Sequence, residues 1–346
     1  MNQSLKGAIL LTLLAVGMNV NSQTKYAITE RPDEKRVDIT VNGEPFTSYI
    51  YPDDLMKPVL YPLRTTKGTL VTRGWPLEPR AGERIDHPHH VGMWFNYGNV
   101  NGLDFWNNST AIPQKDKKNY GTIKHVAVLD KTISRDGAIL KVQKDWQTPE
   151  GKTLIKETTK YTFSQTGGQR AIEMDTKLTA QEQDISFDDN KEGLIAIRLA
   201  RELEHPSNTP EIFMDASGKP TEVAALNNEN VTGKYRSSEG VEGDDVWGTR
   251  ARWVNLMGQI ESEPISILIL DNHKNPGYPT YWHARGYGLY AANPLGQHEF
   301  SKGKESLNFK LPAGQSVEFK YKVIITSGSK LSDDEAYKAF NEFTGN

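Results

Sequence analysis

The stretch KTISRDGAILKVQKDWQTPEGKTLIKETTKYTFSQTGGQRAIEMDTKL, residues 131–178, decides the fold. Thr, Lys and Glu alternate in it with Ile, Tyr and Phe, which is the period of strands that have one wet face and one buried face. Turn signals interrupt the alternation at Asp136-Gly137, at Glu150-Gly151 and at the glycine pair of residues 167–168. Residues 122–180 are therefore predicted to form an antiparallel meander with strands of about 8 to 10 residues.

Strand patterns continue on both sides of this meander. RVDITVNGEPFTSYIY, residues 36–51, alternates and then breaks at an Asn-Gly pair, the strongest short-range hairpin signal. PISILIL, residues 264–270, is a continuous apolar run typical of a buried central strand. SLNFKLPAGQSVEFKYKVIIT, residues 306–326, predicts two more strands around an Ala-Gly pair.

One helix is predicted, at the carboxyl end. LSDDEAYKAFNEF, residues 331–343, carries Ser332 and Glu335 at the spacing of a capping box. We see no Pro- or Ser-rich linker and no internal repeat in the sequence. We therefore expect an all-β protein, a single large antiparallel β-sandwich over residues 23–346 with one short C-terminal helix.

Residues 1–22 have the pattern of a secretory signal peptide. Lys6 precedes an apolar run of about a dozen residues, and small residues follow it before Gln23. The run is shorter than the roughly 20 residues that a transmembrane helix needs. The chain has no cysteine, which excludes disulfides, thiolate chemistry and a lipoprotein anchor. The sequence thus predicts a protein of the periplasm or the medium.

Composition excludes several classes of partner and reaction. The net charge is −3, and the basic residues are scattered, so nucleic acid and anionic membrane surfaces are not expected partners. The sequence holds no GxGxxG, P-loop, GxSxG or HExxH motif. Nucleotide, flavin and serine-hydrolase chemistry therefore lack support, and a small molecule or an oligosaccharide is the expected ligand.

The segment DHPHHVGMWF, residues 86–95, places three of the eight histidines around one proline. In an extended backbone His87 and His89 would point to one side and could share a metal ion, with His90 on the other side. Alternatively, one imidazole acts as a general acid or base near pH 7, with Asp86 or Asp104 fixing its tautomer. A hydrogen-bonded structural turn is the third interpretation.

A second polar cluster lies at residues 270–300. In the part YWHARGYG, residues 281–288, Tyr281, His283, Arg285 and Tyr287 alternate onto one face. Arginine binds carboxylates or phosphates in a bidentate way, and tyrosine offers a flat apolar surface with a polar tip that suits sugar rings. A solvent-exposed strand face is the alternative.

A weaker basic patch lies at residues 246–258. Arg250 and Arg252 are expected on one side of a short strand there, and Arg198 ends another predicted strand. Such a patch fits an acidic or hydroxyl-rich ligand, although two surface arginines on an edge strand would look the same.

The two histidine segments resemble a known family. DHPHHVGMWF with GNVNGLDFW, and PTYWHARGYGLYAANPLG, are similar to the bacterial family DUF6807, whose members carry the label "PmoA family", over residues 35–328. The resemblance marks Asp86, His87, His89, His90, Asn101, Asp104, Trp106, His283, Arg285, Tyr287 and Asn293 as motif residues. Val91 stands where members often have Arg. The resemblance implies a secreted protein of glycan-degrading bacteria, and LPAGQSVEFKYKVII, residues 311–325, resembles the closing strands of galactose-mutarotase-like sandwiches.

These observations predict a carbohydrate-active enzyme, a glycoside hydrolase or lyase, with histidine acid and base groups in a polar, aromatic-lined pocket. The alternatives are an enzyme with a divalent metal ion at His87, His89 and His283, and a non-catalytic sugar-binding protein. The expected catalytic residues are His90, His283, Asp86 and Asp271; the expected substrate-binding residues are Arg285, Arg252, Trp94, Asn101, Asp104, Trp106, Tyr281, Tyr287, His273 and Asn293; the metal ligands of the alternative are His87 and His89.

Overall fold

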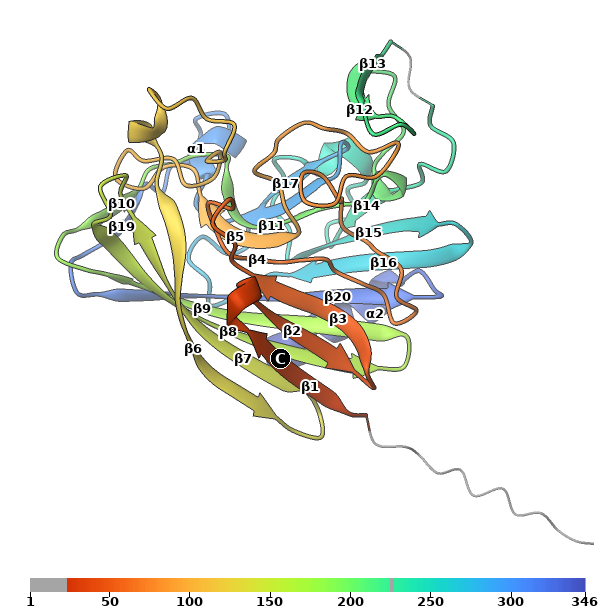
Figure 1. Ribbon diagram of the computed structural model, residues 1–346, viewed down its shortest axis with the longest axis horizontal. Helices are drawn as coiled ribbons and strands as arrows, with labels where there is room; N and C mark the ends of the chain where they lie inside the picture. Colours follow the sequence, from red (N-terminus) through yellow and green to blue (C-terminus); the bar gives the residue numbers. More distant parts are fainter. Residues whose placement is uncertain (1–23, 225–226, 346) are drawn as a thin grey trace, which may run out of the picture.

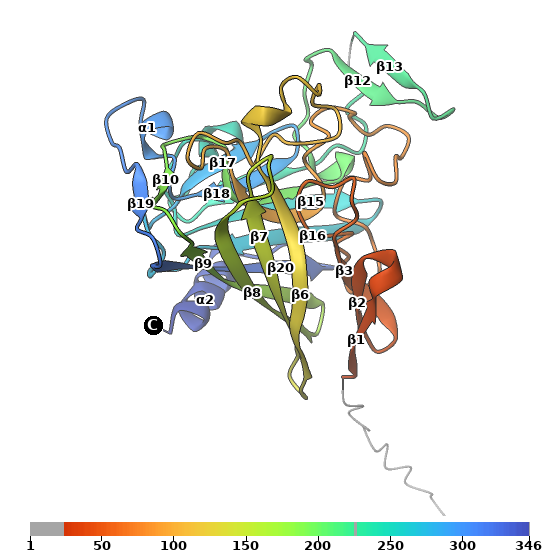
Figure 2. The same ribbon diagram turned by 60° about the vertical axis from the view of Figure 1, so that its left-hand side comes forward.

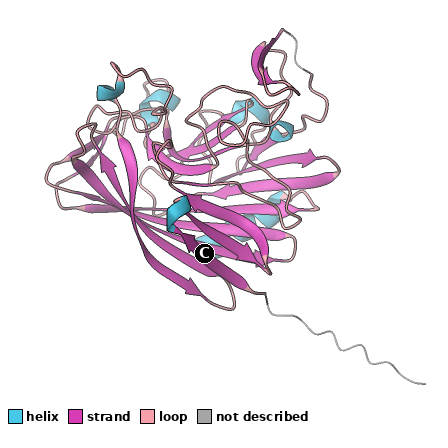
Figure 3. Cartoon of the chain, viewed as in Figure 1, coloured by secondary structure: helices cyan, strands magenta, loops and turns pink. Residues whose placement is uncertain are grey.

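The computed structural model describes residues 24–224 and 227–345, and the predicted signal peptide lies outside them. Strands dominate the chain (Figure 3). One eight-stranded sheet contains, in spatial order, β1 (Tyr26–Arg31), β2 (Arg36–Val41), β3 (Glu44–Ile50), β4 (Val59–Leu60), β5 (Met93–Tyr97), β11 (Gly193–Arg198), β18 (Leu289–Asn293) and β17 (Tyr281–Arg285). The other contains β14 (Lys234–Ser237), β15 (Trp253–Ile260), β16 (Glu263–Leu270), β20 (Ser316–Ser327), β9 (Gln169–Ala180), β8 (Thr153–Thr166), β7 (Ala138–Gln147) and β6 (Thr122–Ile133).

Shorter elements complete the described chain. Two small sheets pair β10 (Ile185–Phe187) with β19 (Phe309–Leu311) and β12 (Glu211–Met214) with β13 (Pro220–Val223). The helices are α1 (Gln297–Phe300) and α2 (Asp333–Thr344), and 3-10 turns lie at Pro32–Glu34, Lys117–Asn119, Arg201–Leu203 and Gly243–Val246. The β12–β13 hairpin projects from the body of the molecule in both ribbon views (Figures 1 and 2).

The two large sheets pack face to face on one apolar core (Figure 1). Phe95 of β5 contacts Trp146 of β7 and Phe319 of β20, with ring centroids 6.5 and 5.8 Å apart. Phe46 of β3 meets Phe163 of β8 at 5.5 Å. The predicted fold class, an all-β antiparallel sandwich, is therefore confirmed.

The meander lies where the sequence predicts it. Strands β6 to β9 follow one another as antiparallel neighbours, and their connections hold the predicted turn residues. In β7 the side chains of Leu140, Val142 and Trp146 are buried, while Lys141 between them is exposed. The apolar run at residues 264–270 falls within β16, which lies between β15 and β20 in the interior of its sheet.

Helix α2 covers the outer face of the second sheet. Its capping box is present: the hydroxyl of Ser332 accepts from the Glu335 amide, and the carboxylate of Glu335 accepts from the Ser332 amide. Phe340 packs into a small cluster with Trp253 and Leu268, on the side of the sheet opposite the main core. Figure 2 shows α2 beside β9 and β20. The four-residue helix α1 was not predicted.

The outer face of the first sheet positions the polar residues. Alternation puts Phe95, Ile197 and Trp282 into the core, so their neighbours Trp94, Arg198 and His283 point away from it. One row of this face crosses four strands as Trp94, Ala196, Ala291 and His283, which are paired in register. The loop at residues 86–91 leads directly into β5 and lies against this face.

Candidate functional site

The segment His87–His90 is a tight turn and not an extended strand. The amide of His90 donates to the carbonyl of His87 at 2.9 Å, and His87 has a φ of 45°. The buried guanidinium of Arg73 donates to the carbonyls of His87 and His90, at 3.0 and 3.2 Å. The expectation that His87 and His89 project to one side was wrong, because the turn brings the two ends together and leaves His89 between them.

Asp86 lies at the centre of a charged network. Arg198 donates to its Oδ1 at 2.6 Å, Arg73 donates to the same atom, and His87 Nδ1 donates to Oδ2 at 2.6 Å. The two arginine side chains are 0% and 1% exposed. Burial by itself raises the pKa of Asp86, but the hydrogen bond from His87 and the charges of Arg198 and Arg73 hold this pKa well below its usual value. Asp86 is therefore a carboxylate at neutral pH.

Four rings stack beside this network. The His87 ring lies parallel to that of Tyr287 at 5.2 Å and to that of His90 at 4.8 Å, and His90 stacks in turn on Trp94 at 5.2 Å. Trp106 meets Trp94 edge-on, with ring centroids 5.3 Å apart. Tyr287 belongs to the turn that follows β17, so the structure brings the two histidine segments of the sequence together.

His87 is the accessible member of the stack. Its side chain is 42% exposed, and its Nδ1 is held by Asp86. Because Nδ1 carries the donated proton, Nε2 presents a lone pair. An exposed imidazole with a carboxylate on its other nitrogen is the arrangement of a general base whose protonated form is stabilised.

His90 and His283 are poor candidates for proton transfer to a ligand, because both are 2% exposed. Arg198 donates to His90 Nδ1 at 3.2 Å, and burial lowers the pKa of His90 well below its usual value. His283 Nδ1 lies 2.9 Å from the carbonyl of Lys191, and burial lowers the pKa of His283 to about 3. Both rings are neutral at pH 7 and serve to pack and orient their neighbours.

A pocket of about 440 Å³ lies on the far side of Tyr287. Arg285, His205 and Trp247 line it, with Asp244 accepting from His205 Nδ1 at 2.9 Å. The guanidinium of Arg285 lies 5.0 Å from the Trp247 ring centroid and makes no ion pair with any carboxylate of the described chain. A cation beside a tyrosine and a tryptophan suits an anionic ligand with an apolar face.

Several expected site residues lie elsewhere. Asp271 accepts from the amides of Asn272 and Thr280 and from the side chain of Asn275, so it anchors its own loop, and burial raises its pKa to about 7. Arg252 donates to the hydroxyl of Tyr337 on α2 at 3.1 Å. Neither residue contacts the histidine turn through these bonds, and their predicted roles find no support in the geometry.

The other residues expected to bind substrate are occupied by the fold. Arg250 and Arg252 precede β15 and do not share a strand, and Arg250 lies over the buried ring of Tyr281. Trp94 and Trp106 are buried. Hydrogen bonds within loops occupy Asn101, Asp104 and Asn293, and His273 is exposed in the loop after β16.

A metal site finds no support either. Among residues 24–224 and 227–345, no group of three or more His, Asp or Glu side chains is arranged to hold a metal ion. His87 Nδ1 is engaged by Asp86, and the rings of His87 and His89 are nearly perpendicular, with centroids 5.6 Å apart.

Sequence reasoning missed Arg73 and overlooked Arg198 as a site residue. Arg198 lies at the end of the predicted strand β11, and its outward position follows from alternation with Ile195 and Ile197. Arg73 belongs to an irregular segment, residues 61–92, which carries no periodic signal.

The fold and this site define an all-β sandwich protein with a histidine–aspartate pair on the outer face of one sheet. The chain belongs to the family of unknown function DUF6807, whose model matches residues 36–341. A comparison with curated proteins gave no match.

Solved structures with a similar course of the chain include enzymes and enzyme-like proteins of sugar metabolism. A galactose mutarotase-like protein from Clostridium acetobutylicum is 11% identical, with 90% of this chain and 100% of that chain covered and a TM-score of 0.41. Galactose 1-epimerase from Lactobacillus acidophilus is 10% identical, with 88% and 99% covered and a TM-score of 0.36. An alpha-galactosidase from Lactobacillus brevis is 9% identical, with 92% of this chain but 41% of that chain covered and a TM-score of 0.41. No helix in the described part of the chain is long and apolar enough to cross a membrane.

Proposed function

We propose that this protein is a carbohydrate-active enzyme in which His87 transfers a proton to or from the substrate. The observation that carries the proposal is the Asp86–His87 pair: an exposed imidazole whose Nδ1 is held at 2.6 Å by a carboxylate that two fully buried arginines fix. Burying two guanidinium groups costs several kcal/mol each unless they are paired. Such a network holds one imidazole in one tautomer and one orientation.

The groups around His87 favour an acidic sugar and β-elimination over hydrolysis. A lyase acting on a uronic acid needs a cation for the substrate carboxylate, a base for the adjacent C–H proton and an acid for the leaving oxygen. Arg285, His87 and Tyr287 are of these three types. Burial raises the pKa of Tyr287 to about 12, so its hydroxyl keeps the proton that a leaving group requires.

The test is a substrate screen with a matched pair of variants. Oligosaccharides of uronic acids are mixed with the protein, and the ultraviolet absorbance of the unsaturated uronate product is followed; p-nitrophenyl glycosides test hydrolysis in parallel. His87→Ala should lower turnover by about 10²-fold or more, the range of a lost general base. His298→Ala, at an exposed histidine on α1, should leave turnover unchanged.

Two results would argue against this function. Full turnover by His87→Ala would remove the proton-transfer role. Binding of uronic acid oligosaccharides without turnover, and with an affinity that stays constant between about pH 5 and 8, would make the protein a sugar-binding protein instead.

We further propose that residues 1–22 direct export and are removed. The support is the cationic start, the short apolar run and the small residues before Gln23. N-terminal sequencing of the protein recovered from expressing bacteria should read Gln23 or a close neighbour, in a periplasmic or secreted fraction. An intact amino terminus in the cytoplasmic fraction would contradict the proposal.

A further inference from the structure

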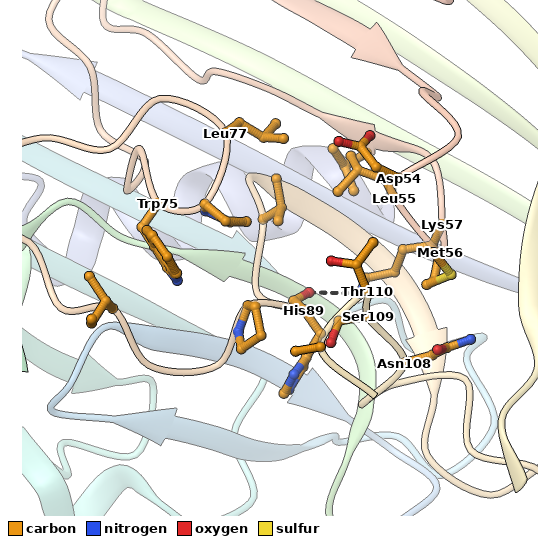
Figure 4. A pocket seen from close by; sticks show the side chains of 16 residues that line it. Asp54, Leu55, Met56, Lys57, Trp75, Leu77, His89, Asn108, Ser109 and Thr110 are labelled. Carbon is orange, nitrogen blue, oxygen red and sulfur yellow. Dashed lines mark hydrogen bonds between the residues drawn. The ribbon is translucent and has the colours of Figure 1, made fainter. Parts of the chain in front are cut away.

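The largest pocket described here, about 540 Å³, lies on the other side of the His87–His90 turn from Tyr287 (Figure 4). In this view Trp75 and Leu77 lie across the pocket from Lys57. Most of its lining is apolar, and His89, Ser109 and Thr110 add polar groups. The apolar lining consists of Leu55, Met56, Val59, Trp75, Pro76, Leu77, Ile85, Pro88, Val91 and Ala111.

Lys57 is the unusual group of this pocket, because it is 4% exposed and has no ion-pair partner among the described residues. Its Nζ donates to the carbonyl of His89 at 2.7 Å and lies 5.3 Å from the centroid of the Trp94 ring. An ammonium group has three donors, and buried lysines without a paired acid are rare.

The surroundings of Lys57 favour its neutral form. Burial lowers its pKa to about 7, against the opposing charge of Asp104. That carboxylate already accepts from the amides of Trp106 and Asn107. The ring of His89, also on the pocket, is neutral because burial lowers its pKa to about 2, and Asp54 lies exposed at the rim. A large fraction of Lys57 is therefore a free amine at neutral pH, and a free amine is a nucleophile.

A polar group beside the amine lacks a partner. His89 Nε2 is buried and makes no hydrogen bond within the described chain. Ser109 and Thr110 line the same pocket. A small hydroxylated ligand would find hydrogen-bond partners there, next to the amine and against an apolar wall.

We propose that this pocket is a carbonyl-binding site, in which Lys57 Nζ forms an imine with the aldehyde or ketone group of an open-chain sugar or a related hydroxycarbonyl compound. The nitrogen lone pair attacks the carbonyl carbon to give a carbinolamine. The carbinolamine then loses one water, made of the former carbonyl oxygen and the two amine hydrogens, and a C=N bond remains. This site is separate from the Asp86–His87 pair and does not rest on its proposed role.

Reductive trapping with glycolaldehyde, the smallest hydroxyaldehyde, tests the proposal. The protein is incubated at pH 7 with glycolaldehyde and sodium cyanoborohydride, which converts an imine into a stable secondary amine. Peptide mass spectrometry then gives the rate of modification at each lysine. Lys57 should react at least about tenfold faster than the exposed Lys141, because an ordinary lysine with a pKa near 10.4 is almost wholly protonated at pH 7.

The pH dependence and a variant complete the experiment. Labelling of Lys57 should rise with a midpoint near pH 7, and that of Lys141 with a midpoint near 10. Lys57→Met should remove the fast site, and His87→Ala should retain it. Modification of Lys57 no faster than that of Lys141 would overturn the proposal, and this comparison within the wild-type protein decides even where Lys57→Met fails to fold.

Discussion

Asp86 connects stability to the site, because its carboxylate is the counter-charge of two arginines that are almost fully buried. Asp86→Asn keeps the shape and removes the charge, so both guanidinium groups lose their ion pair. We expect the free energy of unfolding to fall by about 3 kcal/mol, as when one partner of a buried ion pair is removed. Urea unfolding of both proteins measures this. Asp136→Asn is the matched control, since Asn-Gly suits the exposed β6–β7 turn as well as Asp-Gly.

The same pair of proteins should show a defined pH dependence. The pKa of Asp86 is lower in the folded state than its unfolded value of about 3.9, so its contribution is present above that pH and is lost as the pH falls toward the lowered value. The difference between wild type and Asp86→Asn should be constant from pH 7 to about 5 and should narrow below about 4. A difference that grows on acidification would contradict this assignment.

At this scale the sequence predicted the neighbourhood and missed the roles. Asp86 and the three histidines stand out because histidine is rare in the chain. Which imidazole is exposed depends on the turn, and Arg73 holds this turn from a segment without periodicity. The partners of Lys57 are likewise set by tertiary contacts, so the choice of His90 and His283 over His87 could not be corrected from the sequence.

Helix α2 offers a prediction at the scale of one element. The Ser332 hydroxyl accepts from the Glu335 amide at 3.3 Å, which satisfies one free donor of the first turn. Ser332→Ala should therefore lower the free energy of unfolding by about 1 kcal/mol, and Ser332→Thr should keep most of it. Thermal unfolding followed by circular dichroism measures the change. Equal stability of the alanine and threonine variants would show that the cap contributes nothing.

Elements with local signals were predictable, and elements defined by their neighbours were not. The hairpins at residues 42–43 and 136–137 form because their turn residues accept the required backbone angles. In contrast, β19 pairs with β10 and not with β20, although only a short turn separates it from β20. Lys144 occupies an inward position of β7, where it forms a buried ion pair with Glu157. Both outcomes depend on partners that are distant in the sequence.

At the scale of the molecule, the sandwich gathers the site from four separate segments. Arg73, the His87–His90 turn, Arg198 at the end of β11 and Tyr287 after β17 meet on the outer face of the first sheet. Alternation along β5, β11 and β17 predicts which side chains leave the core. The spatial order of these strands, with β11 between β5 and β18, comes from long-range pairing and cannot be read from the sequence.

The shared core leads to the last prediction, that both sheets unfold together. Phe95 of the first sheet contacts Trp146 and Phe319 of the second, so neither sheet keeps its apolar face without the other. Phe95→Ala should lower the free energy of unfolding by about 3 kcal/mol or more. Tryptophan fluorescence and far-ultraviolet circular dichroism should report one coincident transition in urea for wild type and variant. Ile212→Ala, at an exposed side chain of the β12–β13 hairpin, should leave the midpoint unchanged. Two separate transitions, with Phe95→Ala shifting one of them alone, would instead divide residues 23–346 into two domains.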